Sequence, residues 1–135
     1  MMDRKGYTLM EILIAVAIVG ILSAAAITNY GRTIQLSRFQ TMNDVLQQIY
    51  TGEQVYFSNK DTFLAAACTS SAANQATWRL LYVDSPCDGT VTYVVDSVAA
   101  ATSTTSATFT ATATWGTKTR TINQDRTLGG NWTTP

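Results

Sequence analysis

Residues 1–30 read MMDRKGYTLMEILIAVAIVGILSAAAITNY, a short charged start followed by a long apolar run. Residues 12–27 carry no charge, and with their edges the run approaches the roughly 20 residues that a helix needs to cross a bilayer. Glu11 lies at the front edge of this run. Because a charge there costs free energy, up to roughly 3 kcal/mol at a bilayer centre, its position predicts a functional partner.

The charges around the apolar run predict its orientation. Arg4 and Lys5 precede it, and nothing as concentrated follows. Because positive flanks tend to stay in the cytoplasm, we expect a cytoplasmic N-terminus and an exported remainder. An ordinary secretory signal, cut after the small residues 23–26, is the alternative.

A helical pattern continues beyond that possible cleavage site. No Pro or Gly lies between Gly31 and Gly52, and apolar residues recur at spacings of three, four or seven. These are Leu36, Phe39, Met42, Leu46, Ile49 and Tyr56. One helix is therefore expected from about residue 7 to about residue 57, roughly 77 Å long at 1.5 Å per residue. Its front half needs lipid or sister helices, and its rear half needs a folded domain.

Composition limits the chemistry that the chain can perform. The 135 residues contain nine basic and nine acidic side chains without strong clustering, and no histidine. The length fits one domain plus the apolar segment. We expect no catalytic residue, metal site or cofactor, and we expect no nucleic-acid binding because no basic patch is visible.

The segment KGYTLMEI, residues 5–12, resembles the processing site of type IV prepilins and of the pseudopilins of type II secretion. It has a basic leader ending in Gly6, an aromatic residue, Thr, two apolar residues and Glu11. The similarity continues through Gly20 and residues 52–59, and covers roughly the first sixty residues. It implies a leader at residues 1–6, cleavage between Gly6 and Tyr7 by prepilin peptidase, and N-methylation of Tyr7.

The resemblance also implies how the chain assembles. Residues 7–30 would cross the inner membrane and later form the filament core, and residues 31–58 would be the amphipathic half of the helix. An inner-membrane assembly platform would build the homopolymer. Glu11 would meet the Tyr7 ammonium of a neighbouring subunit. Thr28 stands where many relatives have Pro and keeps its backbone donor, so the resemblance alone does not imply a kinked or locally melted helix between Gly20 and Thr28.

Residues 59–135 predict an exported domain with an antiparallel meander packed on the helix, which gives an α+β pilin fold. The expected strands are 78–83, 90–95, 107–115 and 117–122, with an irregular connection at 63–76 and a bend at 99–106. The clearest is 107–115, where Ala, Phe or Trp alternates with Thr.

Cys68 and Cys87 both lie in this domain. Export into an oxidising compartment favours a disulfide between them, which would stabilise the fold by roughly 3 kcal/mol. Two buried free thiols are the alternative if the domain remains cytosolic.

The expected function is a structural subunit of an extracellular type IV pilus serving adhesion, motility or surface attachment, and not an enzyme. A minor pilin or a pseudopilin is the alternative within the family. A membrane-anchored DNA receptor is the alternative of another class. Its candidate contacts are the basic residues of the exported domain, Lys60, Arg79, Lys118, Arg120 and Arg126.

Overall fold

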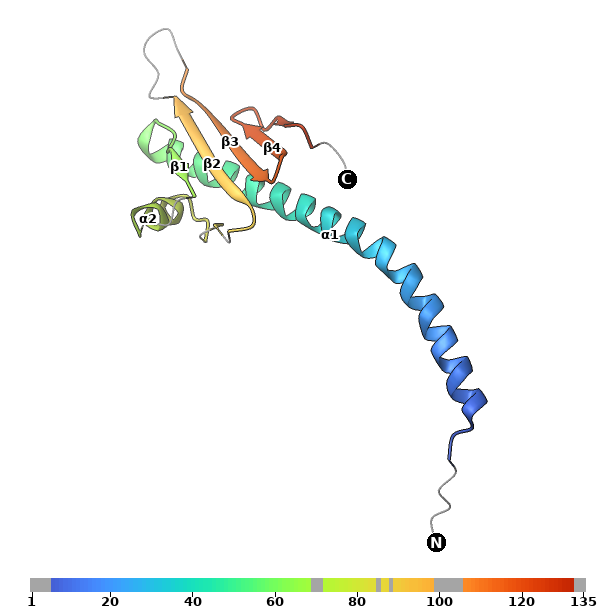
Figure 1. Ribbon diagram of the computed structural model, residues 1–135. Coiled ribbons are helices and arrows are strands. Elements are labelled where there is room, and N and C mark those ends of the chain that lie inside the picture. The colour runs from blue at the N-terminus through green and yellow to red at the C-terminus, as the bar shows by residue number, and fades with distance from the viewer. Residues whose placement is uncertain (1–5, 69–71, 85, 88, 99–105, 133–135) are drawn as a thin grey trace. The chain divides into compact units, whose positions relative to one another are not determined.

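The computed structural model describes residues 6–68, 72–84, 86, 87, 89–98 and 106–132. The chain divides into two units, Met1–Ser37 and Arg38–Pro135. The elements, in chain order, are α1 (Leu9–Lys60), β1 (Ala66–Ala67), α2 (Ala72–Leu80), β2 (Thr92–Val98), β3 (Thr108–Trp115), β4 (Lys118–Asn123) and β5 (Leu128–Gly129) (Figure 1). This is the predicted α+β arrangement of a long N-terminal helix and a small antiparallel sheet.

Helix α1 is continuous and differs from its predicted bounds by two or three residues at each end. Its backbone stays helical through Gly20 and Thr28, as expected for a chain without Pro at that point. The helix ends where Asp61 adopts a left-handed φ of 54° and donates its backbone N–H to the Phe57 carbonyl at 2.8 Å. This is the single hydrogen bond of a left-handed helix cap.

The sheet is an antiparallel meander in the order β1-β2-β3-β4-β5. The predicted alternation in β3 is confirmed, because Phe109, Ala111 and Ala113 are buried whereas Thr110 is exposed. The strands expected at 90–95 and 117–122 are confirmed as β2 and β4 with shifted ends. Strand β5 was not expected, since two residues show no alternation.

The strand predicted at residues 78–83 is wrong. Residues through Leu80 belong to α2, and Tyr82 then turns the chain with a left-handed φ of 57°. Val83 donates its backbone N–H to Trp78 O and Tyr82 donates to Arg79 O, both at 3.1 Å, which is a Schellman cap. A short apolar run is compatible with the periodicity of a strand and with that of a helix. Here Trp78 and Leu81 are both buried and lie three residues apart, which is the spacing of one helix face.

The irregular connection expected at residues 63–76 is wrong in part. It contains β1, whose two residues pair with Val94 and Val95, and the first turn of α2. Backbone hydrogen bonds to the edge of β2 order this stretch although its small side chains give no clear periodicity. The bend expected at 99–106 lies almost wholly outside the described residues.

The core of the unit Arg38–Pro135 joins the rear of α1 to the sheet (Figure 1). Met42, Leu46 and Ile49 are fully buried, as the predicted stripe requires. Phe63 extends this core, with ring centroids 4.6 Å from Phe57 and 4.8 Å from Phe109. Burial of these side chains supplies the main stabilisation of the unit Arg38–Pro135.

Candidate assembly site and its surroundings

The segment with the expected cleavage site lies outside the helix. Gly6 and Tyr7 are exposed and have no regular secondary structure, and α1 begins at Leu9. Thr8 is the N-cap, because its carbonyl accepts the first helical hydrogen bond from Ile12 N at 3.3 Å. Its Oγ1 accepts from Glu11 N, also at 3.3 Å. The bond between Gly6 and Tyr7 therefore lies in exposed backbone outside regular secondary structure.

Glu11 lies in the first turn of α1 and is exposed. Thr8 and Glu11 have the T-x-x-E spacing of a capping box, and a carboxylate there also favours the positive end of the helix dipole. Glu11 thus has a local role in starting the helix. Its pairing with Tyr7 of another subunit remains a prediction, and so does its place in assembly.

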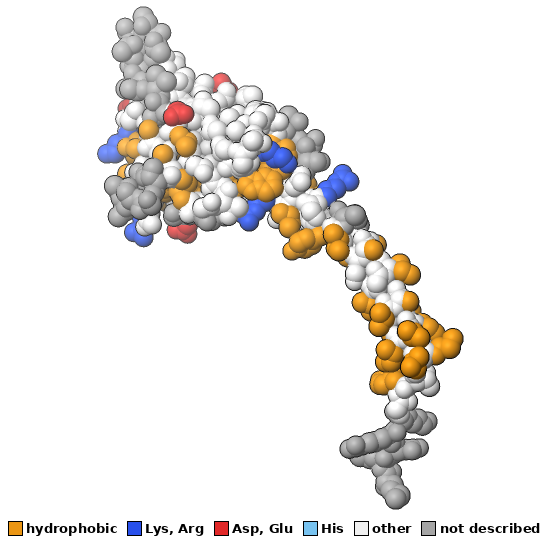
Figure 2. Space-filling view, viewed as in Figure 1, with side chains coloured by type: hydrophobic (Ala, Val, Ile, Leu, Met, Phe, Trp, Pro, Cys, Tyr) orange, Lys and Arg blue, Asp and Glu red, His pale blue; other side chains and the backbone are white. Residues whose placement is uncertain are grey.

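The unit Met1–Ser37 exposes nearly every large apolar side chain that the structure describes in it. Figure 2 shows hydrophobic side chains along this part of the chain. Those more than half exposed are Tyr7, Leu9, Met10, Ile12, Leu13, Ile14, Val16, Ile18, Val19, Ile21, Leu22, Ile27 and Tyr30. Since water covers such a surface unfavourably, it requires lipid or other protein chains.

Helix α1 also contains a segment long and apolar enough to cross a membrane. The segment is not buried in the structure, which distinguishes it from the core helix of a water-soluble domain. An N-terminal signal sequence has the same length and composition. The structure thus agrees with membrane anchoring, and the direction of crossing stays a prediction.

Cys68 and Cys87 form a disulfide with a Cα–Cα distance of 5.4 Å, as expected for an exported domain. Cys68 lies directly after β1, and its backbone N–H donates to Tyr93 O at 2.9 Å. The bond therefore links the residue directly after β1 to the segment before β2.

Lys118 and Arg120 of β4, two of the five basic residues considered for DNA binding, contact protein groups. Arg120 is 7% exposed, and it donates to Asn43 Oδ1 at 3.0 Å and to Trp132 O at 3.2 Å. The Lys118 ammonium lies 4.5 Å from the Trp132 ring centroid. Arg120 thus fastens β4 and the C-terminal segment to α1 and is not part of an exposed basic face.

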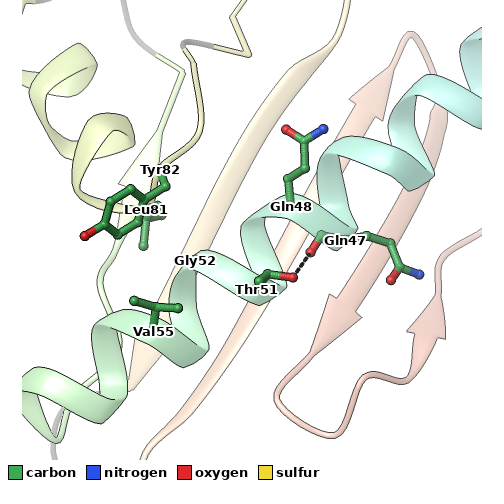
Figure 3. Close-up of a pocket in the computed structure, with 7 residues that line it drawn as sticks. All are labelled: Gln47, Gln48, Thr51, Gly52, Val55, Leu81 and Tyr82. Atoms are coloured by element: carbon green, nitrogen blue, oxygen red, sulfur yellow. Dashed lines mark hydrogen bonds between the residues drawn. The ribbon is translucent and has the colours of Figure 1, made fainter.

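An open groove of about 580 Å³ lies between α1 and the turn after α2. Figure 3 shows Gly52 and Val55 of the helix beside Leu81 and Tyr82 of the turn, whereas the hydroxyl of Thr51, which also lines the groove, is directed toward Gln47. A Cβ at Gly52 would overlap the Leu81 carbonyl oxygen and lie 2.9 Å from the Leu81 carbonyl carbon. Gly52 is therefore required by close backbone approach and not by its φ.

Glu53 is a buried group to which no role was assigned from sequence. It is fully buried, and its Oε2 accepts the Leu64 backbone N–H at 2.9 Å. Burial raises the pKa of Glu53 from 4.5 to about 7, with the Leu64 hydrogen bond partly opposing that rise. The burial of Glu53 could have been predicted from its spacing to Leu46 and Ile49, which places it on the buried stripe of the helix.

Parts of the chain match a known protein family and a known protein. Residues 1–27 match the family described as the prokaryotic N-terminal methylation motif. The chain is also similar to the type IV major pilin protein PilA of Myxococcus xanthus (strain DK1622), with 39% identity over 60 residues, which are 44% of this chain. The match spans 27% of that relative's length. No solved structure matches the chain. Together, the methylation motif and the similarity to this pilin support membership of the type IV pilin family.

Proposed function

We propose that the chain is a structural, non-enzymatic subunit of a type IV pilus that serves adhesion, motility or surface attachment. One observation carries this proposal: the methylation motif coincides with a helix whose large apolar side chains are exposed throughout the described part of residues 6–30. A helix of this kind is not covered by its own chain. A filament of sister helices would bury it.

In this proposal prepilin peptidase cuts the chain between Gly6 and Tyr7 on the cytoplasmic side, and the new Tyr7 amine is methylated. The exposed backbone at Gly6 and Tyr7, which has no regular secondary structure, supports this step, because a protease needs an unfolded segment. Arg4 and Lys5 in the leader favour a cytoplasmic N-terminus.

The mature chain then crosses the inner membrane once, with its disulfide-bonded domain outside. An inner-membrane assembly platform moves it from lipid into an extracellular homopolymer. Glu11 pairs there with the Tyr7 ammonium of the adjacent subunit. Such a pair neutralises both charges in an apolar core and favours one stagger between neighbouring helices.

A minor pilin or a pseudopilin shares the motif and the exposed helix. The proportion of this chain in purified filaments separates these alternatives, because a major subunit is the main component and a minor one is not. The disulfide-stabilised external domain favours the pilus subunit modestly.

Mass spectrometry of the mature N-terminus tests the proposal. We expect a chain that begins with N-methylated Tyr7. A chain that begins near Ile27 would show that the apolar run is a discarded signal peptide and would overturn the proposal, as would a chain that keeps Met1.

A further inference from the structure

The carboxyl group of Glu53 is incompletely paired in the protein interior. Oε2 accepts the Leu64 N–H, whereas Oε1 is buried and has no hydrogen-bond partner within the described residues. An ionised carboxylate in such a site has neither solvent nor a cation to stabilise its charge. Burying the ionised form therefore costs far more free energy than burying the neutral form.

The hydrogen bond from Leu64 connects two parts of the fold. Glu53 belongs to the C-terminal half of α1, and Leu64 lies in the connecting segment, residues 61–68, which contains β1 and ends at Cys68 of the disulfide. Among the side-chain hydrogen bonds that the structure describes, this one alone joins the middle of the connecting segment to the helix.

We propose that Glu53 and Leu64 form a proton-dependent latch, in which neutral Glu53 holds the connecting segment on α1 and ionised Glu53 releases it. The latch lies wholly within the unit Arg38–Pro135. It therefore does not rest on the proposed polymerisation, and its failure would leave that function untouched.

The ionisable groups near Glu53 do not control the opening of the latch, which depends on the ionisation of Glu53 itself. The ionisable side chains of the segments around the C-terminal half of α1 are Arg38, Asp44, Tyr50, Tyr56 and Lys60 of α1, Asp61 of the connecting segment, Arg79 of α2, Tyr82 and Asp84 of the turn after it, Tyr93 and Asp96 of β2, Lys118 and Arg120 of β4, and Arg126, which donates to Gln47. Asp61, Arg79 and Asp96 are exposed, and Arg120 donates to Asn43. Burial and the Leu64 hydrogen bond are the two influences on the pKa of Glu53.

The expected size of the effect follows from the pKa of about 7 in the folded chain and 4.5 as the ordinary value. If Glu53 becomes solvated when the latch opens, opening is favoured wherever only the open form is ionised. Between pH 5 and pH 8.5 the opening equilibrium then rises on the order of 50- to 100-fold. Most of that rise falls below about pH 7, and the curve flattens above it.

Hydrogen exchange of the full chain in detergent micelles tests the latch. The measured quantity is the protection factor of peptides that cover residues 62–67, corrected at each pH for the intrinsic exchange rate. In the wild type we expect protection to fall on the order of 50- to 100-fold from pH 5 to pH 8.5. Glu53→Gln keeps an oxygen that accepts from Leu64 but has no proton to lose, so its protection should stay constant.

Asp44→Asn is the matched control, because Asp44 is an exposed acid on the same helix. It should reproduce the wild-type fall. Constant protection in the wild type would overturn the proposal, and so would an equal fall in Glu53→Gln. If Glu53→Gln does not fold, the wild-type curve still decides: it should flatten near pH 7, and flattening near pH 4.5 would contradict the latch.

Discussion

Replacing Gly52 with Ala tests the contact between α1 and the turn after α2. By helix propensity alone this change stabilises an interior helical position by about 1 kcal/mol. The added Cβ, however, would overlap the Leu81 carbonyl oxygen and lie 2.9 and 3.1 Å from its carbonyl carbon and Cα. All three are backbone atoms, so no side-chain rotation relieves the overlap.

The helix and the turn must therefore separate, which loosens the packing of the fully buried Leu81 and Trp78. Overpacking of this kind costs about 1–3 kcal/mol, or more where backbone must move. Because backbone must move here, we expect a cost in the upper part of this range, about 2–3 kcal/mol. After the gain of about 1 kcal/mol in helix propensity is subtracted, Gly52→Ala should lose about 1–2 kcal/mol. For a domain of this size, that lowers the Tm by roughly 4–15 °C.

Thermal unfolding of the full chain in micelles, followed by tryptophan fluorescence, measures this loss, because Trp78, Trp115 and Trp132 all lie in the folded unit. Gly31→Ala is the matched control on the same helix, since its Cβ would meet no atom within 4 Å. It should leave the Tm unchanged or raise it. A Gly52→Ala chain as stable as the wild type would refute the close-approach reasoning.

The remaining predictions concern three other features of the unit Arg38–Pro135. The pKa of Glu53 is higher in the folded chain than its ordinary value, so folding retains a proton, and the free energy of unfolding should fall by about 3 kcal/mol as pH rises from about 4.5 to 7, then level off. Urea titrations at several pH values measure this, and Glu53→Gln should abolish that fall. Tyr82→Gly should raise stability by about 0.5–1 kcal/mol in the same assay, because Tyr82 is 80% exposed and has a left-handed φ; a loss would show that its ring contributes packing. Reduction of the Cys68–Cys87 disulfide should lower the free energy of unfolding by roughly 3 kcal/mol, and an unchanged urea midpoint would show that the bond is dispensable.

Long periodic segments account for most of what could be predicted from sequence. The stripe through Met42, Leu46 and Ile49 and the alternation through Phe109 and Ala111 each repeat over several residues, so they predicted both the element and its buried face. The disulfide followed from the expected export and an even number of cysteines.

Features that depend on contacts between distant residues could not be predicted. From sequence alone, Gly52 is a residue of low helix propensity, and only the structure shows that the Leu81 backbone lies against it. From sequence, Arg120 is interpreted as a surface charge, whereas in the structure it donates hydrogen bonds to Asn43 and to the Trp132 carbonyl. The spacing between Thr8 and Glu11 was sufficient to predict the capping role of Thr8. Because Glu11 lies beside the apolar run, the sequence was interpreted in terms of assembly only.

The two roles of Glu11 can be separated by a conservative substitution. Glu11→Gln keeps a side chain that suits the third position of a capping box but removes the charge, whereas Glu11→Leu removes both. Both variants should still be cut after Gly6 and enter the membrane, since loss of a charge favours insertion. Loss of one partner of a buried ion pair costs on the order of 3–5 kcal/mol per subunit contact.

The fraction of mature chain recovered in sheared cell-surface filaments, measured when a tagged variant and the wild type are expressed together, tests the central claim most directly. We expect the tagged wild type to be incorporated freely, and Glu11→Gln and Glu11→Leu to accumulate in the membrane and be nearly absent from filaments. Normal incorporation of Glu11→Gln would contradict the pairing with Tyr7. Absence of the wild type itself from filaments would contradict assembly through the N-terminal helix.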